Sequence, residues 1–274
     1  MQKIAVLLTC FNRVQKTLSC LDNLFSGVPD NVELSVFLVD DGSTDGTGTM
    51  VKNKYPKVNV IEGTGNLYWN RGMHLAWDTA SKEKSFDYYM LLNDDTFLYP
   101  GAIQELLDCA QSLENRVVVC AAFCSEFSGR YSYGGRNENG EPIVPNGKVQ
   151  ECHSINGNCL LVPKLVYDKV GNLDPIFPHA IGDFDYGYRA KSKGFASVTT
   201  KRYLGTCENN EFLPKWCYSN VPFKERIKSL YSPLGNSHPK YYFIYIKRHF
   251  GLPLALKHFL SIHLRLLMPS LWKQ

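Results

Sequence analysis

Acidic residues stand together at three points of the 274-residue sequence: Asp40-Asp41, Asp94-Asp95, and Asp183 with Asp185. Two adjacent carboxylates repel each other, so a site that holds both needs a cation or hydrogen-bond donors nearby. Mg²⁺ and Mn²⁺ take oxygen ligands and are often bound by one or two carboxylates together with substrate phosphates. Asp94-Asp95 is therefore a candidate for a metal and phosphate site. The alternative for this pair, and for Asp40-Asp41, is a polar turn, because Asp and Asn are common turn residues.

Two of the acidic clusters follow predicted strands. Apolar runs at Lys3–Thr9, Glu33–Val39 and Tyr88–Leu92 are typical of buried strands, and the last two run straight into acidic stretches. Helical patterns separate these strands, and the alternation predicts an α/β fold with a mostly parallel sheet and helices on both faces. Open sheets of this kind bind ligands at the carboxyl ends of their strands. We therefore expect the acids to share one edge of the sheet.

The second half of the chain continues this alternation. The elements predicted there are a strand over Val117–Phe123, a strand over Ile155–Val162, a helix with Pro163 at its first position, and a helix over Asp183–Lys193. Between residues 125 and 151, Gly, Asn, Pro and Tyr interrupt short segments. This pattern predicts a small antiparallel addition and not a new domain.

The composition is that of a globular protein in a reducing compartment. The nine Cys include no Cys-x-x-Cys pair, and Cys10, Cys120 and Cys159 lie within apolar runs typical of buried thiols. Neither a disulfide framework nor a zinc site is indicated, so we expect a cytoplasmic protein. The run Ile4–Cys10 is too short for a signal peptide, and no apolar stretch reaches the length of a transmembrane helix.

The C-terminal tail is basic. No acid follows Glu225, whereas eight cationic residues do: Arg226, Lys228, Lys240, Lys247, Arg248, Lys257, Arg265 and Lys273. Because the whole chain has a net charge of +4, these eight leave residues 1–225 with −4. We expect a main domain over residues 1–220 and a basic, aromatic helical tail over 221–274.

Within that tail, Lys257, Ser261 and Arg265 form a polar stripe opposite apolar residues. Basic amphipathic helices bind anionic membrane surfaces, so the protein is expected to be peripheral on the inner face of the cell membrane. An ordinary helix packed on the body is the alternative.

Five motifs fall in the order seen in family-2 glycosyltransferases. They are Thr9-Cys10-Phe11-Asn12-Arg13, Asp40-Asp41-Gly42-Ser43-Thr44-Asp45-Gly46-Thr47, Gly65-Asn66-Leu67-Tyr68-Trp69-Asn70-Arg71-Gly72, Asn93-Asp94-Asp95, and Gly182-Asp183-Phe184-Asp185 with Arg189. Each motif alone is weak, but five in order at fitting spacing are specific, and the chain resembles the family over roughly residues 1–205. The resemblance implies a GT-A-type, Rossmann-like fold and a metal-dependent inverting glycosyltransferase of the bacterial surface-polysaccharide, rhamnosyltransferase-like kind.

The resemblance also implies which residues hold the nucleotide-sugar donor. Phe11 would stack on the base with Thr9 beside it, and Asp41 would accept the N3 proton of a pyrimidine, which favours a UDP- or dTDP-linked sugar. Asp94 would lie near the ribose. Arg71 would touch the diphosphate, unless it is an ordinary surface residue of a helix. Other residues of the matching motifs are implied to bind the donor: Arg13, Asp40, Gly65 and Asn66.

For the chemistry itself, the resemblance implies Asp95 as the ligand of Mn²⁺ or Mg²⁺ and Asp183 as the general base. The ion would stabilise the leaving diphosphate, and the base would take the proton of the acceptor hydroxyl from the opposite face of the sugar. Asp185 and Arg189 would support the start of this helix, where the small Gly182 is expected to leave room for substrate. A solvated acid in the first helical turn is the alternative for Asp183.

The sequence departs from the family at one point and leaves two other functions open. Many relatives carry a further metal-binding His after the final strand, where Cys207, Glu208 or water would have to substitute here. A nucleotidyltransferase would need a Gly-rich phosphate loop, which residues 9–13 lack. A non-catalytic nucleotide-sugar-binding module is the other possibility. The expected acceptor is a glycan or a lipid-linked glycan, and no nucleic-acid partner is expected.

Overall fold

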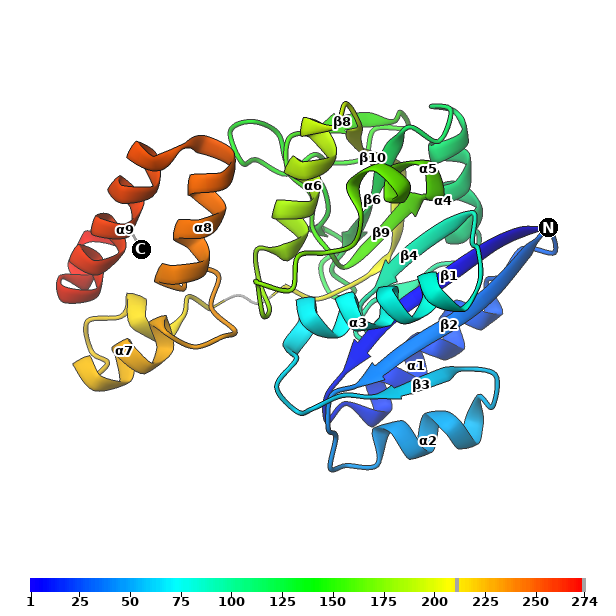
Figure 1. Cartoon of the computed structure of the whole chain (residues 1–274), viewed down its shortest axis with the longest axis horizontal. Helices are drawn as coiled ribbons and strands as arrows, with labels where there is room; N and C mark the ends of the chain where they lie inside the picture. The colour runs from blue at the N-terminus through cyan, green and yellow to red at the C-terminus, as the bar shows by residue number, and fades with distance from the viewer. Residues whose placement is uncertain (210–211, 273–274) are drawn as a thin grey trace.

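The computed structural model describes residues 1–209 and 212–272, which fold around one ten-stranded sheet (Figure 1). The strands are β1 (Gln2–Cys10), β2 (Val32–Asp40), β3 (Asn59–Glu62), β4 (Tyr88–Leu92), β5 (Phe97–Leu98), β6 (Val117–Cys124), β7 (Tyr131–Tyr133), β8 (Gln150–Cys152), β9 (Cys159–Pro163) and β10 (Ala196–Thr206). The α-helices are α1 (Val14–Ser26), α2 (Thr47–Lys54), α3 (Tyr68–Glu83), α4 (Ala102–Gln111), α5 (Lys164–Val170), α6 (Gly182–Ser192), α7 (Phe223–Leu230), α8 (Pro239–Phe250) and α9 (Leu252–Leu267). Two short 3₁₀ helices, η1 (Lys215–Cys217) and η2 (Pro269–Leu271), complete the chain.

The strand order across the sheet is β3-β2-β1-β4-β9-β6-β10-β5, with β7 paired to β6 and β8 to β10. Strands β3, β2, β1 and β4 pair in parallel, and β6 and β10 run in the same direction. The predicted mostly parallel sheet is therefore confirmed. Strand β9 runs antiparallel between β4 and β6, so it begins at the edge where its neighbours end.

Helices bury both faces of the sheet, as predicted. Along β1, the side chains of Ile4, Val6 and Leu8 pack with residues of α1, α2 and α4. Those of Ala5 and Leu7 pack with residues of α3, α5 and α6. This division follows from the strand geometry, because successive side chains point to opposite faces. The packing fixes the strands and, with them, the residues at their carboxyl ends.

The small antiparallel addition is present, because β7 pairs antiparallel with β6 and β8 with β10. Two predicted boundaries differ. The strand expected from Ile155 begins only at Cys159, because a turn stabilised by an Asn158–Asn156 hydrogen bond precedes it. Pro163 does not occupy the first helical position: it ends β9 in an extended conformation, and α5 begins at the next residue.

The predicted helical tail forms a lobe of α7, α8 and α9 beside α6 (Figure 1). Helix α8 packs on the start of α6 through a cluster that includes Phe177, Ile181, Tyr245 and Ile246. Lys273, one of the basic residues of the tail, lies outside the described residues. Within the described chain, no helix combines the length and the apolar composition needed to cross a membrane.

Candidate functional site

An arginine from the turn after β1 holds the two acids that follow β4. Nη1 of Arg13 lies 3.1 Å from Asp94 Oδ1 and 2.8 Å from Asp95 Oδ2. Thr17 of α1 donates a further hydrogen bond to Asp94 at 3.2 Å. Two adjacent acids were expected to need a cation nearby, and Arg13 is that cation in the structure. The structure thus brings three of the predicted site residues together at the carboxyl edge of the sheet.

The acidic pair carries excess negative charge at neutral pH. Burial raises the pKa of Asp94 to about 6, an effect that Arg13 opposes and Asp95 reinforces. Above this pH Asp94 is ionised, and Arg13 offers a single positive charge to two acidic side chains. Such a pair suits a divalent cation that is bound together with phosphate oxygens.

The expected third metal ligands are engaged elsewhere. Cys207 is buried, and its Sγ accepts a hydrogen bond from Asn158 Nδ2 at 3.0 Å. Burial raises the pKa of this thiol to about 11, so it stays protonated at neutral pH. Glu208 accepts a hydrogen bond from the backbone N–H of Glu126 at 2.6 Å. Among the described residues, no group of three His, Cys, Asp or Glu side chains is placed to hold a metal ion.

Asp41, after β2, shapes the loop that leads into α3. Its Oδ1 accepts a hydrogen bond from the N–H of Gly65 at 2.8 Å, and Oδ2 accepts bonds from Leu67 and Tyr68 at 2.8 and 2.9 Å. Gly65 has a φ of +81°, which favours glycine, and Asn66 is exposed beside it. A carboxylate has about four acceptor sites, so contact of Asp41 with a nucleotide base remains compatible with these bonds and stays a prediction.

The other residues predicted around the base differ in exposure. Thr9 lies under α3, because a Cβ built on Gly72 would come within 2.3 Å of its Oγ1. Phe11 is 52% exposed, so its ring is accessible for stacking. Asp40 accepts two backbone hydrogen bonds at 2.9 Å from the turn before α2 and from α2 itself. Asp40 therefore holds that turn, and a contact with the donor stays a prediction.

Asp183 is buried in the first turn of α6. Its Oδ2 accepts a hydrogen bond from the N–H of Gly157 at 2.8 Å, and Oδ1 accepts one from Phe184 at 2.9 Å. Burial raises the pKa of Asp183 to about 6, although both backbone bonds lower it. The alternative of a solvated first-turn acid is therefore wrong. The fully buried Asp185 pairs with Arg189 of the same helix at 2.8 Å, and their expected support of this turn stays a prediction.

Trp69 connects Asp183 to the end of β4, and sequence reasoning did not single it out. Its Nε1 donates a hydrogen bond to Asn93 Oδ1 at 2.6 Å. A Cβ built on Gly157 would lie 2.5 Å from the indole ring and 3.3 Å from the Cβ of Asp183. The backbone N–H of Trp69 donates to Nδ1 of His179 at 3.3 Å. Trp69 stands in one of the family motifs, but its type alone did not distinguish it from a core aromatic residue.

Gly182 and Arg71 contact protein where substrate was expected. A Cβ on Gly182 would lie 1.7 Å from Asn70 Oδ1, so the side chain of Asn70, and not substrate, fills the space beside this glycine. Nε of Arg71 donates to the carbonyl of Pro175 at 2.8 Å and ties α3 to the loop before α6. A contact of Arg71 with the diphosphate stays a prediction.

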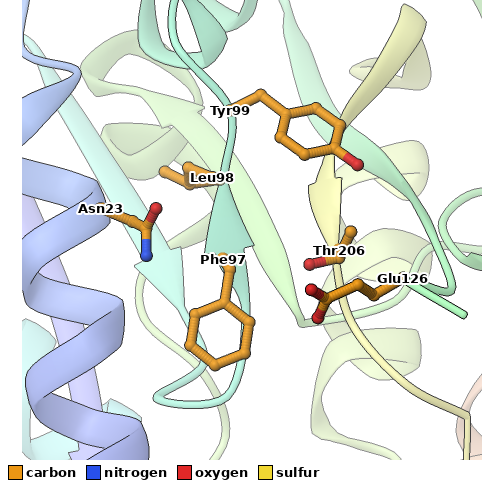
Figure 2. A pocket seen from close by; sticks show the side chains of 6 residues that line it. All are labelled: Asn23, Phe97, Leu98, Tyr99, Glu126 and Thr206. Atoms are coloured by element: carbon orange, nitrogen blue, oxygen red, sulfur yellow. The ribbon is translucent and has the colours of Figure 1, made fainter.

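A cleft of about 440 Å³ opens around the β5 segment, between α1 and the carboxyl ends of β6 and β10. Its lining residues are Asn23, Phe97, Leu98, Tyr99, Glu126 and Thr206 (Figure 2). In Figure 2, Asn23 of α1 lies on one side of the β5 segment. Glu126, which follows β6, and Thr206 at the end of β10 lie on the other side. Sequence reasoning did not predict this cleft, because its walls come from four separate parts of the chain.

Comparison with known sequences identifies relatives of the chain. The sequence pattern of glycosyl transferase family 2 matches residues 5–161. An N-acetylglucosaminyl-diphospho-decaprenol L-rhamnosyltransferase of Mycobacterium tuberculosis is 25% identical in an alignment 195 positions long, which covers 60% of this chain and 63% of that protein. The chain thus matches less than two thirds of that relative's length. An uncharacterized glycosyltransferase of Rickettsia prowazekii is 23% identical in an alignment 236 positions long, which covers 77% of this chain and 70% of the relative.

Solved structures share the fold at low identity. Residues 1–349 of S. aureus TarS align with a TM-score of 0.58 and 13% identity, covering 91% of this chain and 72% of that one. A mannosyltransferase of Pyrobaculum calidifontis, solved with GDP-Man and Mn²⁺, aligns with a TM-score of 0.56 and 14% identity, covering 94% and 73%. These alignments confirm the predicted GT-A fold. With more than half of its residues matching the family pattern, the chain belongs to glycosyl transferase family 2.

Proposed function

We propose that the protein is an inverting glycosyltransferase that moves a sugar from a nucleoside diphosphate-linked donor to a hydroxyl group of a glycan acceptor. The observation that carries this proposal is the buried carboxylate of Asp183, which Gly157 and Trp69 connect to the end of β4. Asp183, as a proton acceptor, thereby lies close to the carboxyl edge of the sheet. The acidic pair Asp94-Asp95 at this edge suits a cation that is bound together with a diphosphate. Membership of the family supports the same class of reaction.

Asp183 would act as the general base. Its two backbone hydrogen bonds fix the carboxyl group. Its pKa of about 6 makes it a stronger base than an ordinary aspartate, yet leaves it ionised at neutral pH. The acceptor hydroxyl loses its proton to this group and attacks the sugar on the face opposite the diphosphate, so the product has inverted configuration.

The donor nucleotide would lie over the ends of β1 and β2. The exposed ring of Phe11 would stack on the base, and Asp41 would accept the imino proton of a uracil or thymine. A UDP- or dTDP-linked sugar fits this arrangement. Asp94 would lie near the ribose. Arg13, which pairs with Asp94, would bind the diphosphate through its positive charge.

Asp95 would hold Mn²⁺ or Mg²⁺ together with the donor diphosphate. This acid is 27% exposed on its side chain, whereas Asp94 is only 6% exposed, so Asp95 is the more accessible ligand. It would have to exchange its contact with Arg13 for the metal. When bound, the ion would stabilise the negative charge of the leaving diphosphate. The mannosyltransferase of the same fold, solved with GDP-Man and Mn²⁺, supports the use of a divalent ion.

We place the acceptor among lipid-linked glycans, in the synthesis of a bacterial surface polysaccharide. The M. tuberculosis relative is named for L-rhamnosyl transfer to an acceptor on diphospho-decaprenol. A membrane-bound acceptor would favour an enzyme that binds the membrane surface. The nine cysteines of the chain are all buried and free, which agrees with a reducing compartment on the inner face of the membrane.

Helix α9 offers a surface for such binding. Its Leu252, Leu256, Leu260 and Leu264 follow at four-residue intervals and are each 48–66% exposed. Lys257 is exposed on the same helix, and no acid follows Glu225 in the sequence. An apolar stripe with cationic neighbours and no acids complements an anionic lipid surface.

A donor panel tests the proposed reaction. The protein would be incubated with UDP-, dTDP- and GDP-linked sugars in the presence of Mn²⁺, and release of nucleoside diphosphate would be measured. We expect release from a UDP- or dTDP-linked sugar. Formation of pyrophosphate from a nucleoside triphosphate and a sugar phosphate would indicate a nucleotidyltransferase instead. Nucleotide binding without turnover of any donor would indicate a binding module.

A further inference from the structure

The backbone at the start of α6 is strained. Ile181, which precedes the helix, has a φ of +78°, a left-handed conformation that β-branched residues rarely adopt. Such conformations persist only where the surrounding structure holds them in place. The backbone N–H of Asp185 bonds to the carbonyl of Ile181 at 2.8 Å, which closes the turn that contains Asp183. Whatever holds Ile181 and Asp185 therefore also fixes the carboxyl group of Asp183.

Helix α8 supplies the apolar contacts that keep Ile181 in this conformation. Ile181 is 3% exposed and belongs to one buried cluster with Phe177 and with Tyr245 and Ile246 of α8. About two turns further along α6, the ring centre of Tyr188 lies 6.0 Å from that of Tyr245. Figure 1 shows α8 beside α6, with α9 on the side of α8 that faces away from the sheet.

Asp185 makes the charged contacts between α6 and α8. Its Oδ1 lies 2.7 Å from Nη1 of Arg248 and 2.8 Å from Nε2 of His249, and its Oδ2 lies 2.8 Å from Arg189. Nη2 of Arg248 also pairs with Asp174 of the loop before α6 at 2.7 Å. A fully buried carboxylate is unfavourable unless it is paired, and two of these three partners stand on α8.

We propose that Arg248 and His249 are positioning residues, which hold the base Asp183 in place by binding Asp185. The C-terminal helices are then a support of the reaction centre and not only a tail. Substitution of Arg248 is the stronger test of the two. Arg248 pairs with Asp185 and with Asp174 of the loop before α6, and so contacts the chain on both sides of the strained Ile181. This inference rests on the proposed role of Asp183.

Three variants of the full chain test the proposal. Arg248→Gln removes the bridging charge, Arg248→Lys keeps the charge but not the two-pronged geometry, and Lys247→Gln removes an exposed charge from the same helix. Two measurements are made on each variant. One is kcat and KM for nucleotide release from the donor found in the panel, and the other is amide hydrogen exchange across the start of α6 and across α3.

We expect Arg248→Gln to lower kcat about 10- to 100-fold while the KM for donor changes little, since a misplaced base impairs the reaction more than donor binding. Arg248→Lys should recover part of the loss, and Lys247→Gln should match the wild type. Exchange should become about tenfold faster at the start of α6 but not in α3.

Wild-type kcat and exchange in Arg248→Gln would overturn the proposal. So would faster exchange throughout the protein with kcat and donor affinity lost together, because Arg248 would then only stabilise the fold. If the wild type turned over no donor, the proposed function would fail, yet the exchange data would still show whether α8 fixes the start of α6.

Discussion

Asp183 is a buried carboxylate that accepts hydrogen bonds from the backbone N–H groups of Gly157 and Phe184, and this environment sets its protonation. Burial raises its pKa to about 6, so it is protonated below that pH and ionised above it. A base must be ionised to accept a proton. We therefore expect kcat/KM to fall about tenfold for each pH unit below 6 and to be level just above it, as measured in donor turnover from pH 4.5 to 8.

Asp94 requires a control in that experiment, because burial raises its pKa to about 6 as well. Asp94→Asn removes this second titration while Asp183 stays intact. If Asp183 governs the profile, the acid limb persists in this variant at lower overall activity. If the fall of kcat/KM at acid pH disappeared in Asp94→Asn, the titrating group would be Asp94 and not Asp183.

Asp95 is the residue at which a cation and the donor are expected to meet. We predict that Mn²⁺ strengthens binding of UDP or dTDP by about tenfold or more, within the usual range of coupling between two ligands. Asp95→Asn should lose this gain but keep the affinity measured without metal. Asp22→Asn, which changes an exposed acid on α1, is the matched control in the calorimetry. An equal gain from Mn²⁺ in Asp95→Asn would show that the metal binds elsewhere.

At the scale of elements, α3 and α6 meet at Asn70 and Gly182 without space between them. Nδ2 of Asn70 donates to the carbonyls of Asp174 and Phe177 at 2.8 and 2.7 Å, so this side chain cannot easily withdraw. Gly182→Ala would place a Cβ 1.7 Å from its Oδ1. We expect the free energy of unfolding to fall by about 1–3 kcal/mol, the usual effect of overpacking a buried contact.

Denaturant unfolding of Gly182→Ala, Asn70→Ala and the double variant measures this contact. The double variant should be more stable than the sum of the two single effects predicts, since the shortened residue 70 makes room for the new methyl group. Gly27→Ala is a control, because a Cβ there would have an ordinary contact of 3.6 Å. Additive effects in the double variant would contradict this explanation of Gly182.

The elements themselves were predictable where a local pattern decides them. Continuous apolar runs mark β1, β2 and β4 as buried strands, and the acids that follow β2 and β4 share one edge of the sheet because these strands are parallel. The direction of β9 could not be predicted, because a strand buried on both faces has the same apolar pattern in either direction.

Contacts between distant parts of the chain account for the rest of what was missed. Arg13 was assigned to the donor, but its pairing with the acids after β4 depends on the register of β1 against β4. The same holds for Trp69 at Gly157 and for Arg71 at the loop before α6, since no local pattern records these tertiary neighbours.

At the scale of the whole molecule, the C-terminal lobe has two different faces. One packs on α6 through α8, and the other exposes the leucines of α9. Removing the lobe to test membrane binding would also remove Arg248 and His249 from Asp185, so point variants are the better test. Helix α8 packs on α6, whereas α9 leaves its leucines exposed, and binding of α9 to a membrane stays a prediction.

We predict that the protein sediments with vesicles containing phosphatidylglycerol at low salt, and that Leu256→Glu with Leu260→Glu lowers this binding at least about tenfold. The two carboxylates would be repelled by the anionic surface and would be unfavourable in the apolar layer. Salt must be low, because ions screen such contacts. Leu113→Glu, at a leucine 38% exposed on the main body, serves as control. Equal sedimentation of all three proteins would show that α9 is not the membrane surface.

The most direct test of the account is the turnover of Asp183→Asn beside its affinity for the donor. Asparagine keeps the shape of the side chain but cannot accept the proton of the acceptor hydroxyl. We predict that kcat falls by about 10²-fold or more while donor affinity stays close to that of the wild type. Near-wild-type turnover in Asp183→Asn together with an inactive Asp185→Asn would show that the wrong carboxylate was assigned. Full activity of both variants would contradict the displacement mechanism itself.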